Sequence, residues 1–528
     1  SPSSSLLSPS HCHSYHLHPS PLSSLPPHKL IEFDEKGQMI LLCVLFLLFI
    51  IYSIIHHNTL INRLKHNGFV VVPSLPLLGN EPLLSSPYSF KQFGQLAQIY
   101  GKTFALLRGS IPTVITSDPT VIREICIQHF SSFHSHALDP LDSDIYSRSN
   151  LHLFHSRGSR WKRLRTSMST AFSLQAIRMW FTKMELRTDD LIETLPLDKE
   201  ISLHSLFQRH ASSVIAECVF DGDEEGKETF TDAILSFGSP SSFFSLSTFA
   251  YIFPSLTPLI ISIDRRRSQF GPINPLATFT HFLAKTAYLR EADQTPTDFL
   301  QYLKSVEVEE KDIGDGREDL FDPTQSRAIK CITVDELPSQ LRFVSIAGFD
   351  TTANTLTLLC LLLSQNQNIQ DHIRSLIFDL SPDLDTLSNL PYLQWCIWET
   401  LRLFPHASPL STRECTSPIT LSTGLRFDRG TQVVIDTWSL HYDSSLWSEP
   451  HLFRPERFSH SSSLFIPFGI GPRQCIGMRF ALLEIKLALV RLLQRYRIHP
   501  VEGSTCHLTV RDTNTIWPEG IHVRFESL

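Results

Sequence analysis

The sequence has neither an excess of basic residues nor a regular spacing of cysteines, and each absence excludes a class of function. Its 528 residues include 46 Lys and Arg against 53 Asp and Glu, a formal net charge of -7. No broad positive surface is expected, so nucleic acid is not a predicted partner. The ten cysteines and 24 histidines are scattered, and they predict neither a disulfide framework nor a zinc site. A reduced domain that faces the cytosol is the better interpretation.

Residues 1–38 lack any apolar periodicity and are rich in Ser, Pro and His, and the first methionine is Met39. Such a composition predicts a disordered leader, or an upstream extension that does not belong to the functional protein. From Met39 to Ile55 nearly every residue is apolar. A run of this length is at the short end for a membrane span, and residues 39–55 are the predicted transmembrane anchor. A buried core helix is one alternative; a cleaved signal peptide is another, but no small-residue cleavage site follows.

Residues 56–80 are predicted to link this anchor to the main domain at residues 81–528. Arg63 and Lys65 follow the apolar run and favour a cytoplasmic position for the C-terminal side. The segment VVPSLPLLG at 71–79 contains two prolines, which fix φ and remove donors, so we expect a stiff turn rather than a helix or strand.

The most informative motif ends near Cys475. Residues 468–477 read FGIGPRQCIG, and an apolar run from Met478 to Leu493 after them predicts a helix. Free backbone N–H groups and the positive end of the helix dipole favour a thiolate at this place. A thiolate in such a loop is a good axial ligand for haem iron. The alternative is a buried structural thiol, because free cysteine packs as a small hydrophobe.

This loop resembles the haem-binding signature of the cytochrome P450 family, Phe-x-x-Gly-x-Arg-x-Cys-x-Gly, at every fixed position. The resemblance covers residues 73–528. It implies a mainly α fold with a smaller β-rich part and a bound haem b (iron protoporphyrin IX) whose iron ligand is Cys475. Phe468 and Gly477 would then lie against the cofactor. Two segments, one around Trp161 and one at Asp298, resemble the animal branch that includes the family 3 drug-metabolising enzymes and thromboxane synthase.

A second motif, AGFDTT at residues 347–352, lies in an apolar run that predicts a long helix starting near a capping box at Thr333 to Glu336. An acid and two threonines are costly inside an apolar helix unless they serve a function. The alternative is back-bonded hydroxyls beside a solvated Asp350. The family resemblance implies that Ala347 leaves room for dioxygen, while Asp350 and Thr351 supply protons.

Three further charged residues resemble the family's structural network. Glu399 and Arg402 are three residues apart and share one helical face, and Arg457 lies in a later PERF segment. A lone Glu-x-x-Arg is usually a surface pair. The resemblance implies a buried network of all three beneath the haem, which would hold the Cys475 loop.

The resemblance also implies a set of haem propionate ligands. Trp161 and Arg165 share one helical face at i, i+4, and the guanidinium fork suits a carboxylate. Arg413 and Arg473 complete this expected set. From the residues alone, an exposed basic helix with one packed Trp is an alternative for Trp161 and Arg165.

The predicted function is a membrane-anchored haem-thiolate monooxygenase, single-pass in the endoplasmic reticulum membrane, with its catalytic domain in the cytosol. It would insert one oxygen atom from O2 into a lipophilic xenobiotic, sterol or fatty acid. No reductase domain is visible, so NADPH electrons are expected through a separate flavoprotein, NADPH-cytochrome P450 reductase, with cytochrome b5 as a further partner and Lys162 and Arg163 in the docking surface. The expected pocket residues are Phe343, Ile346, Ala407, Ser408, Thr515 and Ile516.

Two other functions are weighed against this one. A haem-thiolate isomerase that rearranges peroxides, as thromboxane synthase does, would need no reductase and no proton delivery by Asp350 and Thr351. A non-catalytic haem-binding protein would bind substrates without product. The intact acid and threonine pair favours the monooxygenase over both.

Overall fold

The computed structural model describes residues 35–142, 152–220, 224–235, 246–270, 275–289, 296–308, 330–460, 465–511 and 515–528. The chain divides into two units, Ser1–Ser53 and Ile54–Leu528. The predicted leader at residues 1–38 lies outside the described residues as far as position 34.

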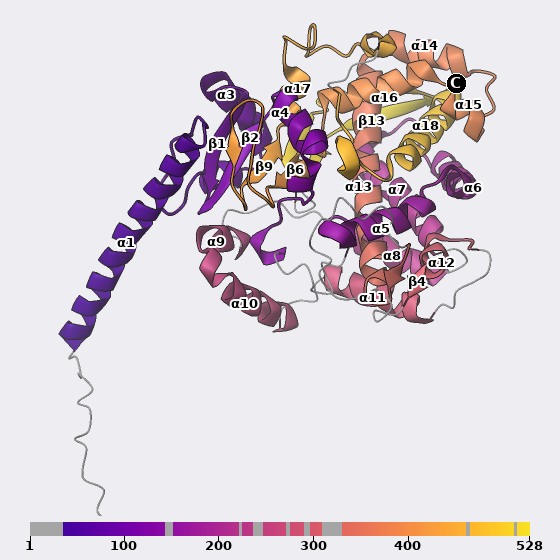
Figure 1. Ribbon diagram of the computed structural model, residues 1–528. Coiled ribbons are helices and arrows are strands. Elements are labelled where there is room, and N and C mark those ends of the chain that lie inside the picture. The colour runs from indigo at the N-terminus through magenta and orange to yellow at the C-terminus, as the bar shows by residue number, and fades with distance from the viewer. Residues whose placement is uncertain are drawn as a thin grey trace, which may run out of the picture. The chain divides into compact units, whose positions relative to one another are not determined.

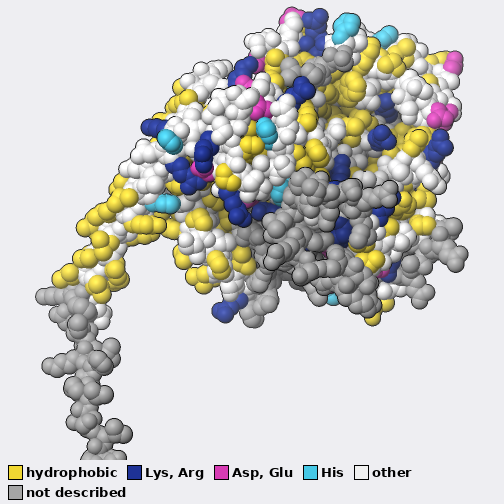
Figure 2. Space-filling model, in the orientation of Figure 1, with side chains coloured by type: hydrophobic (Ala, Val, Ile, Leu, Met, Phe, Trp, Pro, Cys, Tyr) yellow, Lys and Arg dark blue, Asp and Glu magenta, His cyan; other side chains and the backbone are white. Residues whose placement is uncertain are grey.

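Helix α1 spans Glu35–His66 and is longer at both ends than the predicted anchor at 39–55. The first part of the predicted linker is therefore helical. The helix ends before Gly68, whose φ of 91° is a conformation that favours glycine. The apolar side chains between Met39 and Ile55 are mostly exposed, and Figure 2 shows hydrophobic side chains along α1. Two helices of the described chain are long and apolar enough to cross a membrane, Gln38–His66 and the mostly buried Leu337–Gln365.

The unit from Ile54 to Leu528 is mainly helical, as predicted (Figure 1). Its first helices are α2 (Glu81–Leu84), α3 (Ser89–Tyr100), α4 (Pro119–Arg123), α5 (Gly158–Ala171), α6 (Leu174–Glu193), α7 (Leu203–Val219), α8 (Glu224–Leu235), α9 (Leu246–Ile252), α10 (Thr257–Phe270) and α11 (Pro275–Leu289). The later helices are α12 (Phe299–Lys304), α13 (Leu337–Gln365), α14 (Gln367–Ile377), α15 (Leu384–Ser388), α16 (Pro391–Leu403), α17 (Thr437–Tyr442) and α18 (Met478–Arg495).

In the described part of the chain, the smaller β part consists of short strands in five sheets. The four-stranded sheet has the order β1-β2-β9-β6, with β2 and β9 parallel and the other pairs antiparallel. Its strands are β1 (Thr103–Arg108), β2 (Ile111–Thr116), β9 (Gln432–Ile435) and β6 (Thr412–Glu414). A three-stranded sheet has the order β10-β13-β3, with β13 (His522–Ser527) between β10 (Tyr496–Pro500) and β3 (Glu200–Ser202). The two-stranded sheets pair β11 (His507–Val510) with β12 (Ile516–Glu519), β4 (Glu307–Val308) with β5 (Ile332–Thr333), and β7 (Ile419–Thr420) with β8 (Arg426–Phe427).

Helix α13 is the central element of this unit and packs against α7, α11, α16 and α18 (Figure 1). The predicted capping box is formed: Thr333 N–H donates to Glu336 Oε2 at 2.9 Å, and Glu336 N–H donates to Thr333 Oγ1 at 3.2 Å. Pro338 occupies the first turn, where a missing N–H costs nothing. The helix is apolar nearly all round because it lies inside the core, and this packing fixes the AGFDTT motif at the centre of the unit.

The proline-rich segment at 71–79 contains a turn, as predicted. Residues 76–78 form the turn, and it is closed by Leu75 N–H, which donates to Gly79 O at 3.0 Å, and by Gly79 N–H, which donates to Leu75 O at 2.8 Å. Isolated bridges of Val71 with Ala105 and of Gly79 with Arg108 attach the segment to β1. The turn is therefore fixed at the edge of the four-stranded sheet.

Candidate active site

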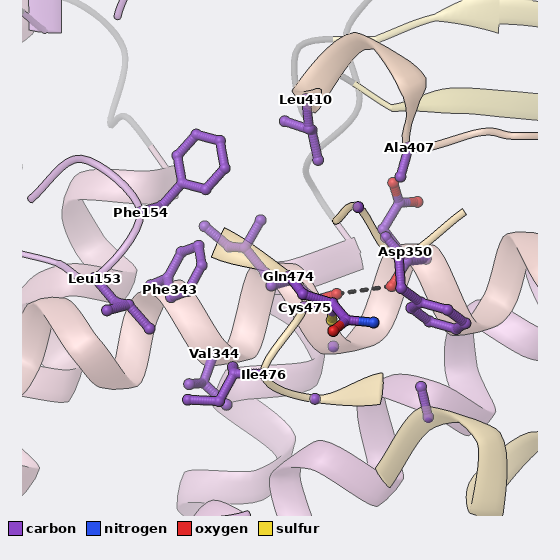
Figure 3. A pocket seen from close by; sticks show the side chains of 18 of the residues that line it. Leu153, Phe154, Phe343, Val344, Asp350, Ala407, Leu410, Gln474, Cys475 and Ile476 are labelled. Atoms are coloured by element: carbon purple, nitrogen blue, oxygen red, sulfur yellow. Dashed lines mark hydrogen bonds between the residues drawn. The ribbon is translucent and has the colours of Figure 1, made fainter. Parts of the chain in front are cut away.

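A cavity of about 670 Å³ lies inside the unit Ile54–Leu528, beside α13. Predicted site residues that line it are Trp161, Arg165, Phe343, Ile346, Ala347, Asp350, Thr351, Ala407, Arg413, Phe468, Arg473, Cys475, Gly477 and Thr515. In Figure 3, Phe154 and Phe343 lie on one side of the cavity, Asp350 and Ala407 lie on the other, and Cys475 lies between them. Two predicted pocket residues, Ser408 and Ile516, are buried next to the cavity without lining it.

Cys475 sits between a 3-10 turn at Gly471–Arg473 and the start of α18. Its N–H donates to Phe468 O at 2.9 Å. Gly471 has a φ of 77°, and a Cβ there would lie 2.2 Å from Cys126 O, so the loop requires glycine. Burial raises the pKa of the Cys475 thiol, while the backbone N–H groups of Gly477 and Met478 and the charge of Arg165 lower it. The helix start therefore favours the thiolate, as expected, although the surrounding protein raises the pKa overall. The thiol is nonetheless exposed to the cavity, and a metal bound there would favour the thiolate further.

The Glu399 carboxylate joins α16 to the 3-10 turn at Pro455–Ser459. Arg402 Nε donates to Glu399 Oε2 at 2.8 Å, and its second terminal nitrogen donates to Oε1 at 2.9 Å. Arg457 Nε and Arg454 N–H also donate to Oε1, at 2.9 and 3.0 Å. Glu399 and Arg402 are completely buried, so the structure brings the three predicted charged residues together.

The AGFDTT motif presents different groups to different neighbours. Ala347 and Thr351 line the cavity, and Thr351 Oγ1 donates to Ala347 O at 2.8 Å, the back-bonding of a helical threonine. Gly348 also lines the cavity, but a Cβ there would lie 2.6 Å from Ile215 Cδ1 on α7. Asp350 is buried and accepts hydrogen bonds from Thr515 Oγ1 and, at 2.9 Å, from Trp517 Nε1. Asp350 is thus not solvated, and these two donors come from the C-terminal end of the chain.

The model of the family described as cytochrome P450 matches residues 71–519. The chain belongs to the cytochrome P450 family. Similar curated proteins of Caenorhabditis elegans are named "Putative cytochrome P450" CYP13A6 and CYP13A3. The first is 28% identical over 469 residues, 83% of this chain and 89% of the relative. The second is 29% identical over 466 residues, 82% of this chain and 88% of the relative. The predicted family, mainly α fold and enzyme class, a cytochrome P450 monooxygenase, are confirmed.

The cavity residues fit the haem that the P450 family implies. Among the described residues, no carboxylate pairs with Arg165, Arg413 or Arg473, and Arg413 Nε is buried without a hydrogen-bond partner. Burial lowers the pKa of Arg165, opposed by Cys475. Cations gathered around one cavity without a counter-ion suit the two propionates of a haem. Two cysteines of the described chain, Cys218 and Cys475, lie in the cavity wall. Cys475 would provide the thiol for the haem iron.

Arg473 has a more specific place in this P450 than its prediction as a propionate ligand. Its guanidinium donates to four backbone carbonyl oxygens, those of His134, Leu153, Phe154 and Ser156, at 2.6 to 3.3 Å. It also lies over the Trp161 ring, 4.6 Å from the centroid. Burial, followed by the charges of Arg413, Arg165 and Arg157, lowers its pKa well below the usual value. Arg473 therefore holds the segment 153–156 against the cavity.

Sequence reasoning missed an aromatic wall of the P450 cavity. His136 stacks on Phe154 at 4.1 Å, and Phe154 stacks on Phe343 at 6.0 Å. His152 stacks on the other side of Phe343 at 5.1 Å, with 4° between the planes. His155 completes the wall. A cluster of histidine and phenylalanine in residues 152–155 was visible in the sequence, but nothing in its spacing indicated a shared cavity.

The expected docking role of Arg163 is wrong. Its two terminal nitrogens donate to Glu336 at 2.7 and 2.9 Å, and the side chain is buried. Helix α5 turns this residue away from solvent and toward the start of α13, so Arg163 anchors two elements instead. Lys162, the preceding residue in the chain, is half-buried.

Proposed function

We propose that this P450 is a membrane-anchored monooxygenase that inserts one oxygen atom from O2 into a lipophilic small molecule of the xenobiotic, sterol or fatty-acid type. The observation that carries the proposal is the placement of the Cys475 thiol and the AGFDTT motif on the same cavity. Cys475 and Thr351 both line this cavity, although 124 residues separate them (475 minus 351). Aromatic and aliphatic side chains form much of the remaining wall, which suits an apolar substrate.

When bound, the haem supplies the reductive activation of dioxygen. The chain supplies everything around it. Cys475 would hold the iron as a thiolate, and Arg165, Arg413 and Trp161 would hold the propionates. Ala347, whose side chain is a single methyl group, lines the cavity and would leave space for dioxygen. Asp350 and Thr351 would hold protons for transfer at their carboxylate and hydroxyl oxygens.

Phe343, Ile346 and Ala407 would hold the substrate and exclude water. Thr515 adds a hydroxyl group to the same wall. The network of Glu399, Arg402 and Arg457 would keep the Cys475 loop in place, since loss of one partner leaves buried charges uncompensated.

The support for an anchor is the exposed apolar surface of α1 and the basic residues Arg63 and Lys65 in its last turn. We propose an endoplasmic reticulum location with the catalytic unit in the cytosol. Electrons would come from NADPH through the reductase that carries FAD and FMN, with cytochrome b5 as a further donor. This arrangement follows from the family membership together with the anchor.

The test of the proposal is the carbon monoxide difference spectrum of the reduced full-length protein. We expect a thiolate-type Soret band in the wild type, its loss in Cys475→Ser, and its retention in Cys506→Ser, a control at an exposed cysteine. A haem-loaded wild type without this band would overturn the proposal. Turnover of a lipid peroxide without NADPH would indicate the isomerase instead.

A further inference from the structure

The carboxylate of Asp350 is held by the C-terminal hairpin of β11 and β12. Asp350 is 1% exposed. Its Oδ2 accepts from Trp517 Nε1 at 2.9 Å and from Thr515 Oγ1. Trp517 Nε1 also lies 3.1 Å from Thr515 Oγ1, so the indole, the hydroxyl and the carboxylate are in mutual contact. Trp517 is itself buried, while Thr515 and Asp350 both line the cavity.

A second tie fixes the same hairpin one helical turn further along α13. Asn354 Nδ2 donates to Ile516 O at 3.4 Å, and Asn354 Oδ1 lies 2.8 Å from His204 Nε2. The His204 ring packs edge-on against Trp517, with centroids 5.0 Å apart. Strand β12 is therefore held against two successive turns of α13. The indole N–H of Trp517 cannot leave the carboxylate without a shift of the hairpin.

We propose that Trp517 and Thr515 are positioning residues for proton delivery, which they serve by fixing the orientation of the Asp350 carboxylate. This inference rests on the proposed role of Asp350. The terminal torsion of an aspartate is broad and two-fold, so an untethered carboxylate samples many orientations. Two donors on one oxygen select a single orientation.

Thr351 does not share this task in the structure, because its hydroxyl donates to Ala347 O. Thr515 is the hydroxyl group that joins the cavity to the carboxylate. The sequence motif therefore contains the carboxylate of Asp350 but not its donors. These donors, Thr515 and Trp517, lie 165 and 167 positions later in the chain.

Four variants separate the hydrogen bonds from the packing. Trp517→Phe keeps an aromatic ring and removes the N–H donor; Thr515→Val removes the hydroxyl at nearly constant volume; Thr515→Ser restores it. Trp395→Phe is the matched control, since Trp395 lies on α16 away from the cavity wall. A further variant, Asp350→Asn, identifies the carboxylate itself.

The first measurement is isotope-edited infrared spectroscopy of the holoenzyme labelled with carboxyl-¹³C aspartate. The carboxylate band lost in Asp350→Asn belongs to Asp350. We expect this band to shift in Trp517→Phe and Thr515→Val, and to return in Thr515→Ser. A band unmoved by Trp517→Phe overturns the inference without using turnover.

The second measurement is substrate-free NADPH oxidation by the full-length enzyme with NADPH-cytochrome P450 reductase in lipid vesicles, in H2O and in D2O. We expect Trp517→Phe to slow it about tenfold, the value of one hydrogen bond to a charged group, with a larger solvent isotope effect. In an Asp350→Asn background, Trp517→Phe should have no further effect. Additive losses overturn the inference alone, whereas an Asp350→Asn variant with wild-type rates overturns the proposed role of Asp350 as well.

Discussion

Two buried glutamates show how differently this fold treats the same side chain. Glu399 is fully buried and accepts from two arginines and one backbone N–H. Glu484, on α18, is also fully buried, yet neither of its oxygens has a hydrogen-bond partner within the described chain. Burial raises the pKa of Glu484 well above its usual value. Glu484 is thus a neutral acid in the folded protein. Its burial lowers the free energy of unfolding at any pH at which an exposed glutamate would be ionised.

Glu484→Gln should make the protein more stable at neutral and alkaline pH. The pKa of Glu484 is higher in the folded than in the unfolded protein. The contribution of Glu484 to the free energy of unfolding is therefore fully present below the unfolded pKa, and it is lost as the pH rises toward the folded pKa. The loss follows a slope of about 1.4 kcal/mol per pH unit. An amide at position 484 has no such slope, so the advantage of the variant should grow from near zero at about pH 4.

The measurement is urea unfolding of wild type and variant between about pH 5 and pH 8. Glu502→Gln, at an exposed position, should leave the pH dependence unchanged. A stability difference for Glu484→Gln that stays constant with pH would show that the buried acid is ionised in the folded protein.

At the level of residues, the sequence motifs predicted which side chains gather around the cavity. Cys475, Ala347 and Arg165 all line it. The partners of those side chains could not be predicted, because they come from segments without a motif. Trp517 is one such residue, since its role depends on the turn that brings β12 to α13. The docking role predicted for Arg163 was wrong for a related reason, because the sequence of a basic helix does not show which of its faces is buried.

At the level of elements, helices α13 and α7 meet at Gly348. The absent Cβ of this glycine faces the side chain of Ile215, which is buried on α7. A glycine inside a helix costs about 1 kcal/mol relative to alanine, so close packing accounts for its presence. The two small residues of the motif therefore have different effects. Ala347 leaves room in the cavity, and Gly348 lets α7 pack closely against α13.

Gly348→Ala should destabilise the protein by about 1–2 kcal/mol, because the new methyl group would lie 2.6 Å from Ile215 Cδ1. Ile215→Val, which removes that atom, should itself cost about 1 kcal/mol. The double variant should be more stable than the sum of the two changes, since the clash disappears and the helix propensity of alanine remains.

Urea unfolding of the four proteins in this double-mutant cycle measures the coupling. Additive effects would show that Ile215 already yields to the added methyl group, and that α13 needs glycine at this position for another reason.

Element boundaries were predictable where a local signal existed. The capping box at Thr333 and Glu336 and the apolar run after Cys475 correctly predicted α13 and α18. The prolines of segment 71–79 likewise signalled the turn at 76–78. The bridges that attach this turn to β1 could not be predicted, because pairing along that edge depends on tertiary contacts that local propensity does not contain.

On the scale of the whole molecule, long-range pairs decide which part of α1 belongs to the catalytic unit. Arg63 Nε donates to Asp428 Oδ2 at 2.7 Å across 365 positions, and Asn67 donates to the same oxygen at 2.9 Å. Leu64 and Phe69 are buried in a core cluster with residues of the sheet and of β8. The boundary of the unit at Ile54 thus lies inside a continuous helix. The end of the apolar run at Ile55 lies beside this boundary, but hydrophobicity does not predict which residues the next turns of the helix contact.

Two deletions should therefore behave differently. Removal of residues 1–53 takes away the exposed apolar part of α1 and keeps Leu64, Phe69 and the Asp428 contacts. We expect this variant to shift from the membrane pellet toward the supernatant, with the thiolate-type carbon monoxide spectrum and the melting temperature of the full chain.

Removal of residues 1–69 also deletes two buried side chains, each worth about 2–5 kcal/mol, so its melting temperature should fall by about 10 °C or more, at roughly 2 °C per kcal/mol. Fractionation and thermal unfolding of the two haem-loaded variants check both expectations. Equal stability of the two would show that the end of α1 is not part of the catalytic core, and full retention of the first deletion in the pellet would show that α1 is not the sole membrane attachment.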